Sequence, residues 1–178
     1  MRRTLQSWLA RISITIVFTT SFVLAQEVRS NYMPGTDFSK YHSYKWVVIA
    51  AAQPNQIVDA EIKQAVDSQL AAKGLTKTTS DQADLYIGYQ VGVNQQQQWT
   101  AYGMGGGLGW GGGMATATST PIDVGTLVLD MYDPTSKQLV WTGRATKTLD
   151  PSNNPEKNQK ELDKSMGKLL KDFPPKQK

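Results

Sequence analysis

The sequence predicts an α+β fold in which two amphipathic helices pack on one face of an antiparallel β-sheet. Two segments, ending near residue 74 and near residue 173, have apolar residues at helical spacing. The segments between them alternate apolar and polar residues with a period of two, which is typical of strands with one buried side. Elements with a single apolar side bury it most economically when both helices cover the same face of the sheet.

The first 25 residues are predicted to be an export signal. Three arginines accompany an apolar run of about thirteen residues, and Val23-Leu24-Ala25 places compact residues ahead of Gln26. The run is shorter than the roughly twenty residues that cross a bilayer. We therefore expect cleavage after Ala25, a periplasmic or secreted mature chain that forms one domain over residues 26–178, and no transmembrane span in it.

Composition limits the classes of partner and cofactor. Of 19 Lys and Arg, three lie in the expected signal, which leaves sixteen against 15 Asp and Glu. A net charge near +1 gives no electrostatic case for nucleic acid binding. The chain has no cysteine and one histidine, so it lacks thiol chemistry, a lipid anchor on cysteine and a multi-histidine metal site. We expect neither a metal nor a cofactor.

The first strand is predicted at residues 43–48, which are rich in aromatic and β-branched side chains. A loop over residues 53–55 leads into a helix with apolar residues at helical spacing from Val58 to Leu70. Gly74 can adopt the left-handed conformation that commonly follows the end of a helix.

A second strand is predicted at residues 85–93 and a hairpin at residues 125–148. In the hairpin, residues 126–132 alternate between apolar and polar side chains. Asp133 and Pro134 then begin a tight turn, and the alternation resumes with Leu139, Trp141 and Gly143. So short a connection predicts antiparallel pairing at the centre of the fold.

The last helix is predicted to begin at Asn154 and Pro155, a capping residue followed by a proline suited to the first turn. Its apolar stripe runs from Leu162 to Phe173, and the two prolines that follow are expected to end it.

Several sequence blocks resemble those of a known family. In order they are Asp37-Phe38-Ser39-Lys40-Tyr41 with Tyr44-Lys45-Trp46, Ala83-Asp84-Leu85, Gly125-Thr126-Leu127-Val128-Leu129-Asp130, Leu139-Val140-Trp141-Thr142-Gly143-Arg144-Ala145 and Leu169-Leu170-Lys171-Asp172-Phe173-Pro174-Pro175. The chain resembles the DUF4136 family of bacterial exported proteins over nearly all of the expected mature sequence. The resemblance implies a fold and an exported location but no activity, because the family's function is unknown. Many members look like lipoproteins, and this chain departs from them in having no cysteine.

Residues 99–114 form a glycine-rich segment with eight glycines. One interpretation is a flexible hairpin loop between two long strands. The other is an adaptive binding tip at which Trp99, Tyr102 and Trp110 contact an envelope protein, a glycan or a lipid headgroup layer. Residues 107–112 match a GxGxxG pattern, but no strand–turn–helix context follows, so nucleotide binding is not expected.

The last helix carries a row of lysines within an arc of about 80°, opposite the apolar stripe. The row consists of Lys157, Lys160, Lys164, Lys168 and Lys171. It is interpreted either as an ordinary solvated face or as a surface attracted to an anionic membrane.

Catalytic constellations are sparse, and we expect no enzyme. The favoured hypothesis is an exported binding or structural module of the cell envelope. The alternative is a hydrolase or glycan-acting enzyme that uses Asp130 or Asp133, although these residues also suit a strand face and a turn.

Overall fold

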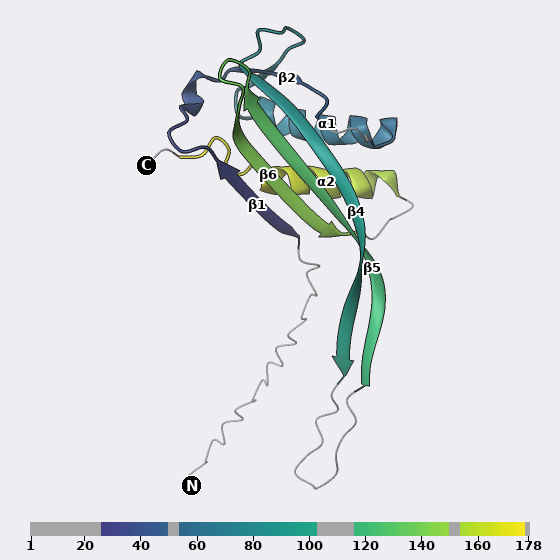
Figure 1. Ribbon diagram of the computed structural model, residues 1–178. Coiled ribbons are helices and arrows are strands. Elements are labelled where there is room, and N and C mark those ends of the chain that lie inside the picture. The colour runs from purple at the N-terminus through teal and green to yellow at the C-terminus, as the bar shows by residue number, and fades with distance from the viewer. Residues whose placement is uncertain (1–25, 50–53, 103–115, 150–153, 177–178) are drawn as a thin grey trace, which may run out of the picture.

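The computed structural model describes residues 26–49, 54–102, 116–149 and 154–176 (Figure 1). The predicted export signal, residues 1–25, lies outside the described residues. So do residues 103–115, which make up most of the glycine-rich segment.

Within the described residues, six strands form one mixed sheet. From edge to edge, the strands are β1 (Glu27–Tyr32), β6 (Gln138–Thr148), β5 (Thr116–Asp133), β4 (Leu85–Tyr102), β2 (Ser43–Trp46) and β3 (Thr76–Lys77). The strands from β1 to β4 in this order pair antiparallel, and β5 and β6 form the predicted hairpin. The predicted α+β arrangement is confirmed, although the sheet is not antiparallel throughout, because β2 runs parallel to β3 and β4 at one edge. A helix intervenes between β2 and its parallel neighbours, and such a crossover can return the chain in the same direction.

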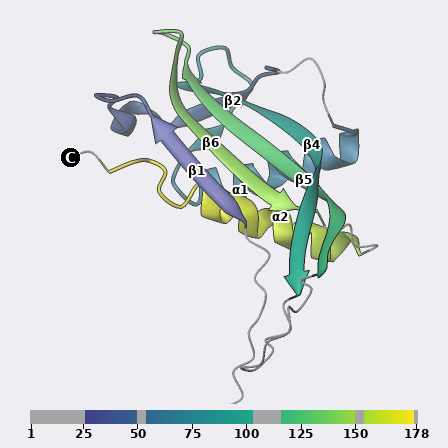
Figure 2. The same cartoon turned by 60° about the horizontal axis from the view of Figure 1, so that its bottom comes forward.

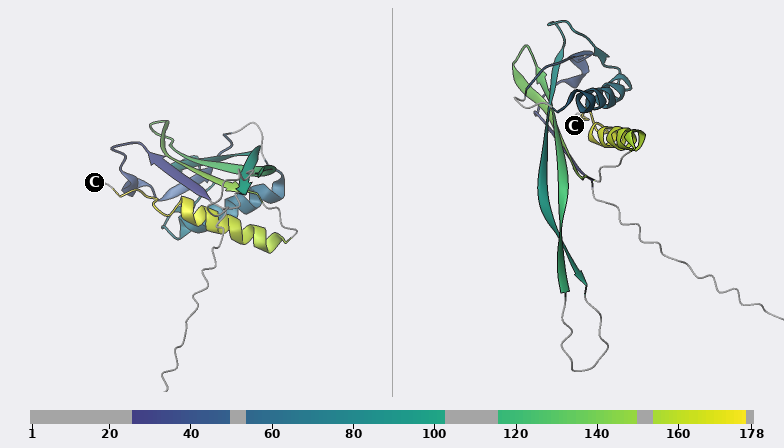
Figure 3. Two further views of the ribbon diagram at one scale, coloured as in Figure 1. Left: turned by 90° about the horizontal axis from the view of Figure 1, so that it is seen from below. Right: turned by 90° about the vertical axis from the view of Figure 1, so that its right-hand side faces the viewer.

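Both helices lie on the same face of the sheet, as predicted (Figure 2, Figure 3). They are α1 (Gln56–Ala71) and α2 (Pro155–Leu169), and they contact each other. A short 3-10 turn, η1 (Phe38–Lys40), precedes β2. No helix in the described ranges has the length and apolar character needed to cross a membrane.

The predicted helix ends are largely confirmed. The predicted cap Asn154 accepts a hydrogen bond from Lys157 N at 2.9 Å. Asn55, expected only in the loop before α1, also caps its helix by accepting a hydrogen bond from Val58 N at 3.0 Å. Gly74 follows α1 with φ of 86°. The expectation that α2 continues to the prolines was wrong, because the helix ends at Leu169. The residue before a proline disfavours helical dihedrals, and Phe173 instead turns into the core.

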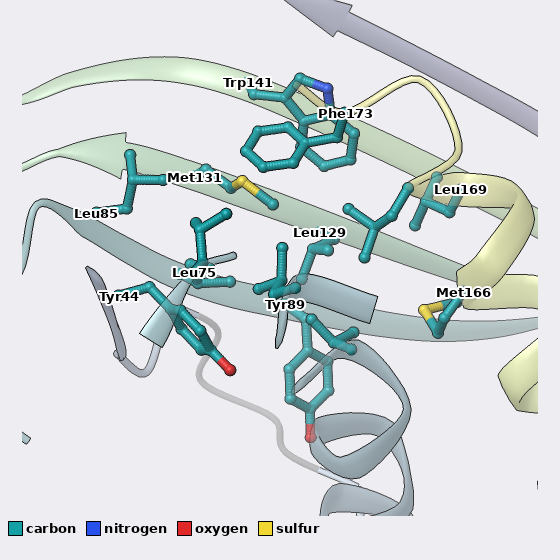
Figure 4. Close-up of a cluster of buried hydrophobic side chains, with 14 of the residues drawn as sticks. Tyr44, Leu75, Leu85, Tyr89, Leu129, Met131, Trp141, Met166, Leu169 and Phe173 are labelled. Carbon is teal, nitrogen blue, oxygen red and sulfur yellow. The ribbon is translucent and has the colours of Figure 1, made fainter. Parts of the chain in front are cut away.

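The core lies between the sheet and the helices (Figure 4). Trp141 and Phe173 meet edge to face with ring centroids 5.5 Å apart, and Phe38 packs on Phe173 at 5.8 Å. Other fully buried side chains come from both layers, namely Tyr44, Val66, Leu70, Leu85, Ile87, Leu129, Met131, Met166, Leu169 and Leu170. The aromatic contacts join the segment before β2 to the end of the chain.

The alternation of buried and exposed residues that was expected in β6 from Leu139 onward is wrong at Leu139 itself. A register irregularity between Met131 and Tyr132 places Leu139 opposite Tyr132, and Leu139 is 37% exposed. Val140 and Trp141 are both buried instead. A bulge of this kind shifts which side of the strand its residues face, so a strict period of two cannot predict it.

Candidate binding surfaces

The most prominent surface feature is a two-stranded arm, which we define as residues 95–102 of β4 and 116–123 of β5 (Figure 1, Figure 3). Its register is unbroken from Gln95 opposite Asp123 to Tyr102 opposite Thr116. At its base, Leu149 N donates to Asp123 O at 2.7 Å. At about 3.4 Å per residue, eight residues carry the arm roughly 25 Å beyond the rest of the sheet.

The strand character of the arm comes from pairing and not from a buried face. Val93, just before the arm, is 63% exposed, although it continues the apolar positions of β4. Gln95, Gln96 and Gln97 are exposed, so this polar run has no period-two signal. The sequence pattern therefore predicts a strand that ends at residue 93, whereas β4 continues to Tyr102.

The structure places two of the three predicted aromatic binding residues on the arm. Trp99 and Tyr102 belong to the last four residues of β4, opposite Ser119 and Thr116. The expectation of a loop over residues 99–114 was therefore wrong for residues 99–102, which belong to β4. Trp110 lies outside the described residues.

The five predicted lysines lie on the outer side of α2 and just beyond its end. All are exposed, while Met166, Leu169 and Leu170 are buried against the sheet. The predicted separation of an apolar side and a lysine side of this helix is therefore confirmed. Glu161, a nearby acidic residue, forms an ion pair with Lys147 of β6.

Asp133 is buried and holds together the turn and the segment before β2. Its carboxylate accepts hydrogen bonds from Lys40 Nζ at 2.8 Å, Tyr41 Oη at 2.9 Å and the backbone N–H groups of Thr135 and Ser136. Burial would by itself raise the pKa of Asp133, but these bonds, led by the one from Lys40, lower that pKa to about 2. These contacts keep the carboxylate ionised and fixed in place.

Asp130 lies in the central strand β5, opposite Gly88 of β4 and Thr142 of β6. It is 7% exposed, and its carboxylate accepts a hydrogen bond from Thr142 Oγ1 at 2.6 Å. The partners of Asp130 and Asp133 differ, and the structure brings neither together with the arm.

Two further carboxylates, neither of them predicted as functional residues, form hydrogen bonds between α1 and the sheet. Asp67 of α1 accepts hydrogen bonds from Tyr44 Oη at 2.7 Å and Trp46 Nε1 at 2.8 Å. Asp59, one of the first residues of α1, accepts one from Tyr89 Oη at 2.5 Å, and this bond lowers the pKa of Asp59. Burial, followed by these bonds, raises the pKa of both tyrosines. Each bond links a helix to the sheet over a separation that local spacing cannot reveal.

An open hollow of about 260 Å³ lies over β1 and β6, lined by Glu27, Arg29, Arg144 and Thr146. Glu27 and Arg29 form an ion pair whose side chains are 57% and 80% exposed. Because these side chains are so exposed, a ligand bound in the hollow would remain largely in contact with water, which is unlike a typical small-molecule site.

A model of a protein family matches residues 28–175, which include every described strand and helix apart from the first residue of β1. That family is described as a domain of unknown function, DUF4136. The chain belongs to the DUF4136 family. Membership confirms the resemblance found in the sequence blocks and brings no activity with it. No curated protein matches this DUF4136 chain.

Solved structures share the fold of this DUF4136 protein at low sequence identity. A PDZ domain protein from Parabacteroides distasonis matches with a TM-score of 0.56 and 13% identity over 86% of this chain, which spans only 37% of that protein's chain. The PelC dodecamer from Paraburkholderia phytofirmans matches with a TM-score of 0.53 and 14% identity, over 86% of this chain and 100% of the other. At these identities the likeness shows a common fold alone.

Proposed function

We propose that this protein is an exported, non-enzymatic module of the bacterial cell envelope whose arm presents residues 99–114 to a partner protein, glycan or headgroup layer. The observation that carries the proposal is the arm itself. It extends the chain from the body to Tyr102 and returns it from Thr116, and these register partners flank residues 103–115, which include all eight glycines of the glycine-rich segment.

Ordering the arm costs conformational entropy, and the burial of apolar side chains in the arm does little to offset that cost. A two-stranded ribbon is at best marginally stable in water, and the exposed valine and glutamines show that this one gains little from an apolar core. Binding residues are commonly displayed on projecting segments held by a rigid scaffold. A contact made at the arm's end would explain why the chain maintains it.

A non-enzymatic role is supported by how the carboxylates are used. A general acid or base works best with a pKa near the operating pH. Asp133, with a pKa of about 2, is instead held by four donors, and Asp130 bonds to a threonine. The PelC protein that shares the fold is described as a dodecamer, so the fold occurs in an assembly of many copies.

The test compares two positions for a photo-crosslinking amino acid in intact envelopes. One probe replaces Trp110, and the control probe replaces Lys137, which lies in the β5–β6 turn at the other end of the hairpin from the arm. We expect a discrete adduct from position 110 and none of that size from position 137. Deleting residues 103–113 from the chain should leave the melting temperature nearly unchanged and abolish competition for the adduct. Identical adducts from both positions, or full competition by the deletion variant, would contradict the proposal.

A second candidate contact is the lysine row, and its exposure on the outer side of α2 is the observation that favours it. Each lysine close to an anionic lipid surface contributes about 1 kcal/mol of attraction. The apolar side of α2 is committed to the core, so the contact would be peripheral and would not involve insertion.

Sedimentation with phosphatidylglycerol vesicles tests this contact. Lys160→Glu with Lys164→Glu should reduce binding at low salt, and Lys137→Glu with Lys176→Glu is the charge-matched control. Wild-type binding should fall as salt screens the attraction. Binding that ignores salt, or that both pairs reduce equally, would count against the lysine row.

A further inference from the structure

The outer edge of β4 is open along the arm. On that side β2 pairs with β4 only at residues 85–87, where Val47 N also donates to Ile87 O at 2.8 Å. Beyond residue 89, no strand in the described ranges pairs with this edge. Because successive residues of a strand point their backbone groups to alternate sides, the groups of Val91, Val93, Gln95 and Gln97 face outward with those of Ile87.

Two features of β5 support this assignment of sides. Pro121 has no N–H group and lies opposite Gln97. Because Gln97 and Pro121 form a non-hydrogen-bonded pair in this assignment, the missing N–H removes no hydrogen bond between β4 and β5. Asp123 lies opposite Gln95, and its carbonyl oxygen turns away from β4 to accept the bond from Leu149. The odd-numbered residues of both strands in the arm therefore direct their backbone groups away from each other.

The β4 edge lacks the usual protection against pairing. Exposed edges are normally blocked by charged residues, prolines or bulges. All 18 residues of β4 are free of charge and proline, and the register with β5 is unbroken from Tyr86 to Tyr102. The opposite edge of the arm contains Pro121 and Asp123, and the edge strand β1 carries Glu27 and Arg29.

We propose that the outer edge of β4, over residues 90–102, pairs antiparallel with the same edge of a second copy of this chain. An antiparallel two-fold pairing brings a strand against itself, so the edge must be compatible with its own sequence. An uncharged strand meets no repulsion there, and its run of four glutamines, residues 95–98, can form amide hydrogen bonds to the same run in the partner. The result is a four-stranded sheet in which each marginal ribbon gains a partner. This inference goes beyond the proposed function, since it concerns the edge of the arm and not the segment at its end.

Proline substitutions test the edge without breaking the arm. In Gln95→Pro with Gln97→Pro, the lost N–H groups face outward, so the pairing of β4 with β5 is retained. Ser119→Pro is the control, because it removes an outward N–H from the other edge, two residues from a proline that β5 already accommodates. Sedimentation equilibrium should show concentration-dependent dimers of the wild type and of Ser119→Pro. The double variant should dimerise at least tenfold more weakly.

A cysteine scan gives a second, independent measurement. The chain has no cysteine, so a single one at each of positions 94–98 reports only on its own surroundings. Opposed residues of an antiparallel pair have Cβ atoms about 4.5–5.5 Å apart, which allows a disulfide to form. We expect rapid covalent dimers at one or two adjacent positions and none for Ser119→Cys. A monomeric wild type, equal disruption by both kinds of proline variant, or uniform slow crosslinking along the scan would overturn the proposal.

Discussion

Replacing Asp133 with Asn should destabilise the protein, and the loss should depend on pH in a defined direction. In the folded chain the carboxylate pairs with Lys40 and Tyr41 and caps the turn through two backbone N–H groups. An asparagine keeps an acceptor for the turn but loses the negative charge that holds the lysine. The side chain of Asp133 is 6% exposed, so water replaces little of what is lost.

The size of the effect follows from the pKa. Folding lowers the pKa of Asp133 from an ordinary 3.8 to about 2. At about 1.4 kcal/mol per pH unit, this difference corresponds to about 2 kcal/mol of stability. Because the folded pKa is the lower one, the contribution is complete above the unfolded pKa of 3.8 and is lost as the pH falls toward 2. About half of it should remain at pH 3.

Urea unfolding of the wild type and of Asp133→Asn, from pH 7 to pH 3, measures this difference directly. The free energies of unfolding should differ by about 2 kcal/mol at pH 7 and by about half of that at pH 3. Asp172→Asn removes an exposed carboxylate and controls for the change in net charge. A difference that stays constant with pH, or that grows toward acid, would refute the assignment of the ionised carboxylate to the turn.

Two further substitutions test the packing and a cap. Gly143→Ala should cost about 1–3 kcal/mol, because a Cβ there would lie 2.3 Å from the Trp141 ring, whereas Gly92→Ala, with nothing within 4 Å, should cost nothing measurable by thermal unfolding. Equal effects of the two would contradict the close contact at Trp141. Asn154→Ala should cost about 1 kcal/mol through the lost bond to Lys157 N, and Asn154→Gly only a few tenths, and chemical unfolding that fails to separate them would remove the capping role.

The elements predicted correctly are those whose signals are local. The cap at Asn154, Gly74 after α1, and the turn at Asp133 each depend on a few neighbouring residues. The placement of both helices on one face followed from one-sided apolar patterns. In the same way, the wheel positions of the α2 lysines predicted their exposure.

The elements that the sequence could not predict depend on distant partners. β1 has no alternation and is held by pairing with β6, more than a hundred residues away. The parallel direction of β2 is set by its neighbours and not by its four residues. The arm begins with the exposed polar run Gln95, Gln96 and Gln97, which has no period-two signal, so only the pairing register defines it as a strand. For the hydrogen bonds that Tyr44 and Trp46 donate to Asp67, the only indication in the sequence was that two aromatic side chains with polar groups lie in a predicted strand.

Excising the arm tests most directly whether the body folds by itself while binding resides in the arm. Asn94 and Val124 are register partners, so an Asn-Gly turn can replace residues 95–123 and close the hairpin. We predict a melting temperature within a few degrees of the wild type, together with loss of both the competition for the position-110 adduct and the dimer. A shortened protein that unfolds at a much lower temperature, that still competes for the adduct or that still dimerises would contradict the claim that the body folds by itself while binding resides in the arm.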